Sequence, residues 1–127
     1  MIEVESNFYV SGIKITPLEV YHGKLAIIAY RFFDVAYITD CSKIPDDSKK
    51  MLNNLKLLFI NALREEHHPT HFSLSEALNV IEELKPEKAV LTHLGHNIDF
   101  EKLQKKLPQN VSFAYDGMKF APLDNNF

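Results

Sequence analysis

The distribution of hydrophobic and polar positions predicts strands over the first third of the chain. Three runs of apolar and alternating residues, FYVSGIKITPLEVY (8–21), KLAIIAYRF (24–32) and VAYITD (35–40), have the length and composition of short strands. Gly12 and Gly23 are turn signals within this region. The chain is therefore expected to begin as mainly β structure.

Further along, the pattern changes to alternating helices and strands. Pro45 and the acidic residues after it predict a helix start in PDDSKKMLNNL, and the apolar run KLLFINAL reads as a buried strand. Ser73, followed three residues later by Glu76, forms a capping-box pattern that predicts a helix over SLSEALNVIEEL. This helix is expected to end at Lys85-Pro86, because proline cannot continue it.

The last third of the chain continues this alternation. KAVLTH reads as a strand, DFEKLQKKL as a short helix, and VSFAYDGMKF as a hairpin or closing strand pair with its turn at Asp116-Gly117. No internal repeat, low-complexity tract or linker divides the sequence. Residues 1–127 are therefore expected to form a single α/β domain.

The composition of the chain excludes some classes of protein but does not identify a function. With 46% hydrophobic residues, the chain can bury a core and is not expected to be disordered. Its 14 basic and 17 acidic residues give a net charge of -3, which argues against a broad nucleic-acid-binding surface. The first residues lack the regions of a signal peptide, and no run reaches the length of a membrane span. A cytoplasmic location without membrane contact is expected.

Histidine and aspartate recur where predicted strands end, which is where open α/β sheets collect chemically active side chains. Cys41 is the only cysteine, so any metal site must use histidine and carboxylate. These groups suit zinc, manganese or iron, and one carboxylate can bridge two ions, so the pattern permits a dinuclear site without demanding it. The residues at these positions are His22, Asp40, His93 and His96, with His67, His68 and His71 in the loop before the central helix.

Each of these residues also has a structural interpretation. His22 precedes a glycine and can be a turn residue, and Asp40 can accept backbone hydrogen bonds after a strand. His67 and His68 lie beside glutamates and a proline, and they read as solvated loop residues. His71 differs from them because it lies just before a helix start, where the positive end of the helix dipole can orient an anion.

Four motifs in a fixed order give the chain a family resemblance. VYHGK, YITDCS, HPTHFSLSEAL and AVLTHLGHNID, read together over Val10 to Lys119, resemble the second half of a metallo-β-lactamase-fold hydrolase. The branch that they resemble is phosphodiesterase-like, and it includes the cyclic phosphodiesterases of phosphonate metabolism and, more distantly, tRNA 3′-processing endonucleases. The resemblance implies half of an αββα sandwich, with one mixed sheet, helices on one face and the N-terminal half absent.

The resemblance also implies a metal site whose ligands come from three of these motifs. His22 matches the third-motif ligand, Asp40 the bridging carboxylate and His93 the last histidine ligand. The implied ions are zinc or manganese, with two ions in the complete site. The implied reaction is attack on phosphorus by a metal-bridging hydroxide, on a small-molecule phosphodiester or RNA.

Four further residues are implied around these ligands. His71 matches the histidine outside the metal shell that contacts the phosphate or protonates the leaving group, and a near-neutral imidazole suits this role. His96, Thr39 and Thr92 are expected to support the site without binding metal, by orienting the ligands or the loops around them.

One principal signature of the family, His-x-His-x-Asp-His, is absent, because no histidine precedes His22. The chain alone is therefore expected to be inactive or weakly active, with a partial or empty metal site. An isolated half would also leave its inner sheet face uncovered, so a homodimer or pairing with the N-terminal half is expected. Two hypotheses stay open: a metal-dependent phosphodiesterase that needs an upstream half, and a non-catalytic, truncated α/β module that self-associates.

Overall fold

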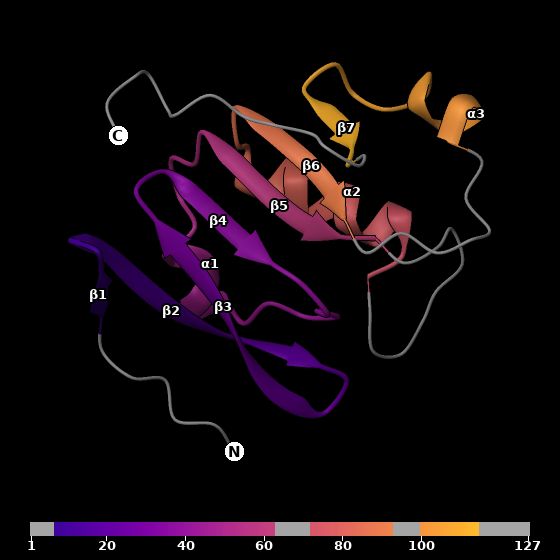
Figure 1. The fold of residues 1–127 in the computed structure, drawn as a ribbon. Helices are drawn as coiled ribbons and strands as arrows, with labels where there is room; N and C mark the ends of the chain where they lie inside the picture. The colour runs from indigo at the N-terminus through magenta and orange to yellow at the C-terminus, as the bar shows by residue number, and fades with distance from the viewer. Residues whose placement is uncertain (1–6, 63–71, 93–99, 115–127) are drawn as a thin grey trace.

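The computed structural model of the chain describes residues 7–62, 72–92 and 100–114. Within them, seven strands form one sheet whose spatial order follows the chain order, and three helices accompany it (Figure 1). The strands are β1 (Phe8–Val10), β2 (Ile13–His22), β3 (Leu25–Phe32), β4 (Val35–Ile38), β5 (Leu57–Asn61), β6 (Lys88–Thr92) and β7 (Val111–Phe113), and the helices are α1 (Asp46–Lys50), α2 (Leu74–Leu84) and α3 (Phe100–Gln104).

The sheet is mixed, as predicted, and its strand directions decide where the loops meet. β1 to β4 pair antiparallel, whereas β4 to β7 pair parallel. Since β2 and β4 both run antiparallel to β3, β2 runs in the same direction as β4, β5 and β6. The carboxyl ends of these four strands therefore lie at one edge of the sheet, where their arrowheads point in Figure 1. We call it the carboxyl edge.

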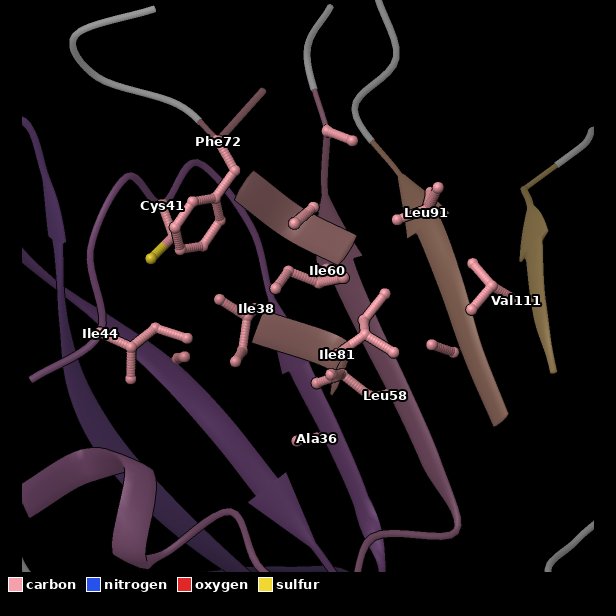
Figure 2. Close-up of a cluster of buried hydrophobic side chains, with 14 of the residues drawn as sticks. Ala36, Ile38, Cys41, Ile44, Leu58, Ile60, Phe72, Ile81, Leu91 and Val111 are labelled. Carbon is pink, nitrogen blue, oxygen red and sulfur yellow. The ribbon is translucent and has the colours of Figure 1, made fainter. Parts of the chain in front are cut away.

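One face of the sheet forms the main core together with the helices. Alternate residues of the three central strands are buried there, and Ile81 of α2 and Leu103 of α3 pack in the same cluster. Figure 2 shows Ile60 and Ile81 among side chains from the neighbouring strands. The strand residues in this layer are Ala36, Ile38, Leu58, Ile60, Ala89 and Leu91. Because α1 and α2 both lie behind the sheet in Figure 1, the predicted single helical layer is confirmed.

The other face of the sheet, here called the open face, has a smaller apolar cluster. Val35, Leu57 and Val90 are buried in it, and no helical residue belongs to this cluster in the described part of the chain. Tyr37 packs on Phe59 with ring centroids 5.4 Å apart, yet Tyr37 stays 46% exposed. The open face therefore presents partly exposed aromatic rings to its surroundings.

The boundaries of the elements differ from the predicted pattern mainly after Pro45. Pro45 is the N-cap residue of α1, as expected, but the helix already ends at Lys50. Asn54 has a left-handed φ of 53°, which is incompatible with a continuing α-helix. Leu52 and Leu55 are buried beyond the helix end, so their apolar spacing reflects core packing and not a longer helix. The hairpin predicted around Asp116-Gly117 lies outside the described residues. Among the described helices, none is long and apolar enough to cross a membrane.

The predicted capping box at the start of α2 is confirmed. The Ser73 hydroxyl accepts a hydrogen bond from the Glu76 backbone N–H at 3.3 Å, and the Glu76 carboxylate accepts one from the Ser73 N–H at 2.9 Å. The helix ends at Leu84, and its C-cap residue Lys85 takes a left-handed φ of 51° before Pro86. Local sequence signals therefore define both ends of this helix.

Replacing Ser73 by Ala is expected to lower the free energy of unfolding by about 0.5–2 kcal/mol, because a helix N–H loses its acceptor. Urea denaturation followed by circular dichroism measures the loss. Glu82→Ala is the matched control, since Glu82 is exposed on the same helix and alanine is a good helix former. An equal loss in both variants would contradict the capping role.

Candidate metal centre

The carboxyl edge gathers the polar residues that the sequence spreads widely along the chain. His22 is the last residue of β2, Asn61 the last of β5 and Thr92 the last of β6, while Asp40 follows β4 after one further residue. Thr39, between β4 and Asp40, is half-buried. These five residues come together because their strands run in one direction.

His22 and Asp40 are joined directly at this edge. The Nδ1 atom of His22 lies 2.9 Å from the backbone carbonyl oxygen of Asp40. A carbonyl oxygen can only accept, so this contact places a proton on Nδ1 and, in the neutral ring, the lone pair on Nε2. A hydrogen bond from one ring nitrogen to a carbonyl is how proteins orient a histidine that binds metal through the other.

The loop that carries Asp40 is tied to the end of β2. The Ser42 N–H donates to the Tyr21 carbonyl at 2.7 Å, and the Tyr21 N–H donates to the Lys43 carbonyl at 2.9 Å. The Ser42 hydroxyl also accepts from the Gly23 N–H at 3.0 Å, in the turn where Gly23 has a φ of 62°. These bonds place the Asp40 loop beside His22.

Asn61 holds the same loop from the opposite direction. Its side-chain oxygen accepts a hydrogen bond from the Cys41 N–H at 3.0 Å, and its side-chain nitrogen donates to the Cys41 carbonyl at 2.8 Å. The Phe72 N–H donates to this carbonyl too, at 2.8 Å. Asn61 and Cys41 are fully buried, and Figure 2 shows the ring of Phe72 beside Cys41. We call this arrangement the Cys41 junction.

The sequence reasoning assigned no role to Asn61. The available signal is an amide residue at the end of the otherwise apolar strand LLFIN. A buried carboxamide needs hydrogen-bond partners, because leaving it unpaired costs free energy. That argument predicts a buried partner for Asn61, but not which residue it is.

Thr92 has an unsatisfied hydroxyl at the same edge. Its Oγ1 is buried and has no hydrogen-bond partner within the described ranges, whereas its carbonyl accepts from the Ala62 N–H at 2.9 Å. Thr92 pairs in register with Asn61, and His93 is the next residue along the chain. An orphaned buried hydroxyl here fits a site that a further group completes.

Cys41 does not belong to the donor set, although it follows Asp40. Its side chain lies in the core, where Sγ donates to the Lys43 carbonyl at 3.2 Å. Burial raises the pKa of the thiol to about 12, while hydrogen bonding with the backbone of Lys43 and Tyr21 lowers it to a smaller extent. The group therefore stays a thiol at neutral pH, and its place in the core keeps it away from the donors at the carboxyl edge.

The donors that remain suit a metal ion. An imidazole and a carboxylate at one edge are ligands that zinc and manganese accept. Within residues 7–62, 72–92 and 100–114, no group of three or more His, Cys, Asp or Glu side chains is placed to hold an ion. His71, His93 and His96 lie outside these ranges. The described part of the chain thus contributes two of the expected donors, His22 and Asp40.

Comparison with known proteins gives a consistent picture. Residues 1–94 match a family described as the beta-lactamase superfamily domain. A crystal structure of a new diphosphatase from the PhnP family superimposes on the chain with a TM-score of 0.90 at 38% identity. The match covers 94% of this chain and 47% of the diphosphatase, so the chain spans about half of that relative.

More distant structures share the fold. The short form of human tRNase Z has a TM-score of 0.68 at 16% identity, over 89% of this chain and 46% of its own. Zn²⁺-bound PqqB from Methylobacterium extorquens has a TM-score of 0.72 at 14% identity, over 92% of this chain and 53% of its own. An octanoyltransferase of Porphyromonas gingivalis is 30% identical over 120 residues, which are 93% of this chain and 24% of that protein.

Proposed function

The chain belongs to the beta-lactamase superfamily and has the metallo-β-lactamase fold, and from this premise we propose that it supplies part of a metal-dependent site for phosphodiester hydrolysis. The membership confirms the resemblance and the fold class that the motifs predicted. The observation that carries the proposal is the hydrogen bond between His22 and Asp40 at the carboxyl edge. It joins an imidazole and the loop of a carboxylate where four parallel strands end.

In this proposal, the metal would be held by His22, Asp40 and His93, with Asp40 as the carboxylate ligand. Zinc fits the imidazole and carboxylate donors, and PqqB with the same fold binds Zn²⁺. Manganese is the alternative ion, since it too accepts these ligands. When bound, the ions lower the pKa of water and stabilise the negative charge that develops on phosphate oxygens.

The residues of the chain then orient the reacting groups. His22 keeps its ring direction through the bond from Nδ1 to the Asp40 carbonyl. His71 would contact the phosphate or donate a proton to the leaving oxygen. The next residue, Phe72, donates its N–H to the Cys41 carbonyl near the carboxyl edge. Thr39, Thr92 and His96 support the ligands and their loops.

A small-molecule phosphodiester is the substrate class that we favour. The 38% identical relative is a diphosphatase, and cleavage of a diphosphate and of a phosphodiester both break a bond between phosphorus and oxygen. The net charge of -3 offers no general attraction to RNA, which leaves RNA as the second candidate. Octanoyl transfer is not carried over, because this chain aligns with only 24% of the octanoyltransferase.

The open face supports a partner in this function. Tyr30 and Tyr37 are 40% and 46% exposed there, beside the buried Val35 and Leu57. Apolar surface of this kind is usually covered in soluble proteins. We propose that the complementary half of the fold covers it. This chain matches 47% of the diphosphatase, so the remaining 53% of that protein lies outside the match and can supply such a half.

Reconstitution tests the proposal. The full chain is mixed with the part of the diphosphatase that it does not cover, assembly is established by light scattering, and hydrolysis of bis(p-nitrophenyl) phosphate is followed with Zn²⁺ or Mn²⁺. We expect turnover only in the assembled complex with metal. An assembled complex without turnover would contradict the enzyme hypothesis, and a stable dimer of the chain alone would favour the self-associating module.

His71→Ala in the reconstituted complex is expected to lower kcat by about 100-fold or more, since a positioned acid or base contributes about 10²–10⁴-fold. His67→Ala and His68→Ala are matched controls from the same loop, and they are expected to keep the turnover. Equal rates in all of these variants would show that His71 has no catalytic role.

A further inference from the structure

The Cys41 junction points to a residue that acts on the metal centre without belonging to it. We propose that Asn61 is a positioning residue, whose side-chain amide fixes the peptide group between Asp40 and Cys41 and thereby sets the placement of Asp40 and His22. The inference rests on the proposed metal centre at these two residues.

The peptide group between Asp40 and Cys41 is bonded at both of its ends. Its carbonyl oxygen, from Asp40, accepts from the His22 Nδ1 at 2.9 Å. Its N–H, from Cys41, donates to the Asn61 side-chain oxygen at 3.0 Å. One peptide plane is therefore held between the end of β2 and the end of β5, and its rotation would disturb both contacts.

Asp40 needs such support because its backbone is unusual. Its φ of 56° lies in the left-handed region, which disfavours side chains with a Cβ atom. Residues in this conformation persist only where the surrounding structure holds them. Asn61 supplies one of the holding contacts directly at the following residue, so its loss is expected to release Asp40 into other conformations.

Asn61 also connects this peptide to the segment that follows His71. The Cys41 carbonyl accepts from the Asn61 side-chain nitrogen and from the Phe72 N–H, each at 2.8 Å. Phe72 is the residue after His71 in the sequence. The Cys41 carbonyl thus accepts both from the Asn61 amide of β5 and from Phe72, the residue after the proposed acid.

Packing alone does not account for an amide at this position. Asn61 is 0% exposed, and its strand is otherwise apolar. Leucine has the same branched arrangement of side-chain heavy atoms and would avoid the cost of burying a polar group. The Asn61 carboxamide offers an acceptor to the Cys41 N–H and a donor to the Cys41 carbonyl through two separate atoms of one planar group.

The experiment compares metal affinity with stability in the full chain, alone and in the reconstituted complex. Asn61→Leu removes both hydrogen bonds, and Asn61→Asp replaces the amide nitrogen, which donates to the Cys41 carbonyl, by a carboxyl oxygen. Ser48→Ala is the matched control: its hydroxyl donates to the Glu19 carbonyl at 2.6 Å, away from the Asp40 loop. Calorimetric titration with Zn²⁺ and Mn²⁺ gives the affinity, and urea denaturation gives the stability.

Both Asn61 variants are expected to bind the ions about 10–100-fold more weakly than the wild type, as for residues that orient metal ligands. Ser48→Ala is expected to lose stability and to keep its metal affinity. A folded Asn61 variant with wild-type affinity would overturn the inference. If the wild-type chain and complex bind neither ion, the proposed metal centre fails, and the inference fails with it.

A measurement on the wild-type protein needs no variant. Metal binding is expected to slow hydrogen exchange at the Cys41 N–H, because ordering Asp40 and His22 tightens the peptide that this N–H shares. The Ser48 N–H serves as the reference. Unchanged exchange at Cys41 in metal-loaded protein would contradict the coupling.

Discussion

Asp40→Asn is expected to abolish most of the metal affinity, with a loss greater than the roughly 100-fold that outer-shell changes reach. The substitution removes the carboxylate charge that is proposed to hold the metal. It leaves the backbone intact, because asparagine tolerates the left-handed φ of 56° that this position requires. The fold is therefore expected to survive, and the change in affinity reports on the carboxylate alone.

Asp47→Asn is the charge-matched control for this test. The Asp47 side chain is 100% exposed on α1, and its nearest basic partner, Lys50, lies at 3.9 Å. Zn²⁺ titration of both variants, with circular dichroism to establish folding, separates a ligand from a surface charge. A folded Asp40→Asn protein that binds zinc as tightly as Asp47→Asn would show that Asp40 is not a ligand.

Ile60→Ala is expected to lower the free energy of unfolding by about 2–5 kcal/mol. Ile60 is fully buried in β5, and it pairs in register with Ile38 of β4 and Leu91 of β6 (Figure 2). The shortened side chain would leave a cavity between these strands and α2. Since small domains have only about 5–15 kcal/mol in total, the variant would be close to unfolding.

Ile60→Val is the control for this core position, with an expected loss of about 0.5–1.5 kcal/mol. Urea denaturation of the two variants gives the difference. A loss below about 1 kcal/mol for Ile60→Ala would contradict close packing at this site. Because Asn61 is the next residue, the metal affinity of Ile60→Ala also tests whether the core layer supports the Cys41 junction.

The elements of this fold are largely predictable because their signals are local. Alternation and turn glycines predict the β-rich beginning, and the pair Ser73 and Glu76 predicts the start of α2, which the structure confirms. Local patterns were less informative where tertiary packing dominates. Leu52 and Leu55 are three positions apart, a spacing typical of a helix, yet they enter the core from irregular backbone after α1.

The candidate site is only partly predictable for the same reason. Residue types at strand ends suggest His22 and Asp40, but no local pattern indicates that the His22 imidazole bonds to the backbone carbonyl of Asp40. No local pattern indicates the left-handed backbone at Asp40 either, since asparagine or glycine would adopt it more readily. His71 and His93 remain predictions, since they lie outside the described residues.

The amino-acid sequence alone determined the kinds of secondary-structure elements, their order and the motifs of the family. These features depend on residue propensity, on periodicity and on residues close together in the chain. The contacts that make a site of them depend on the three-dimensional arrangement. His22 and Asp40 are 18 positions apart, and Cys41 and Asn61 are 20 apart. They meet because β2, β4 and β5 run in the same direction, so that their carboxyl ends lie at one edge of the sheet. This arrangement depends on the packing of the whole sheet against its helices.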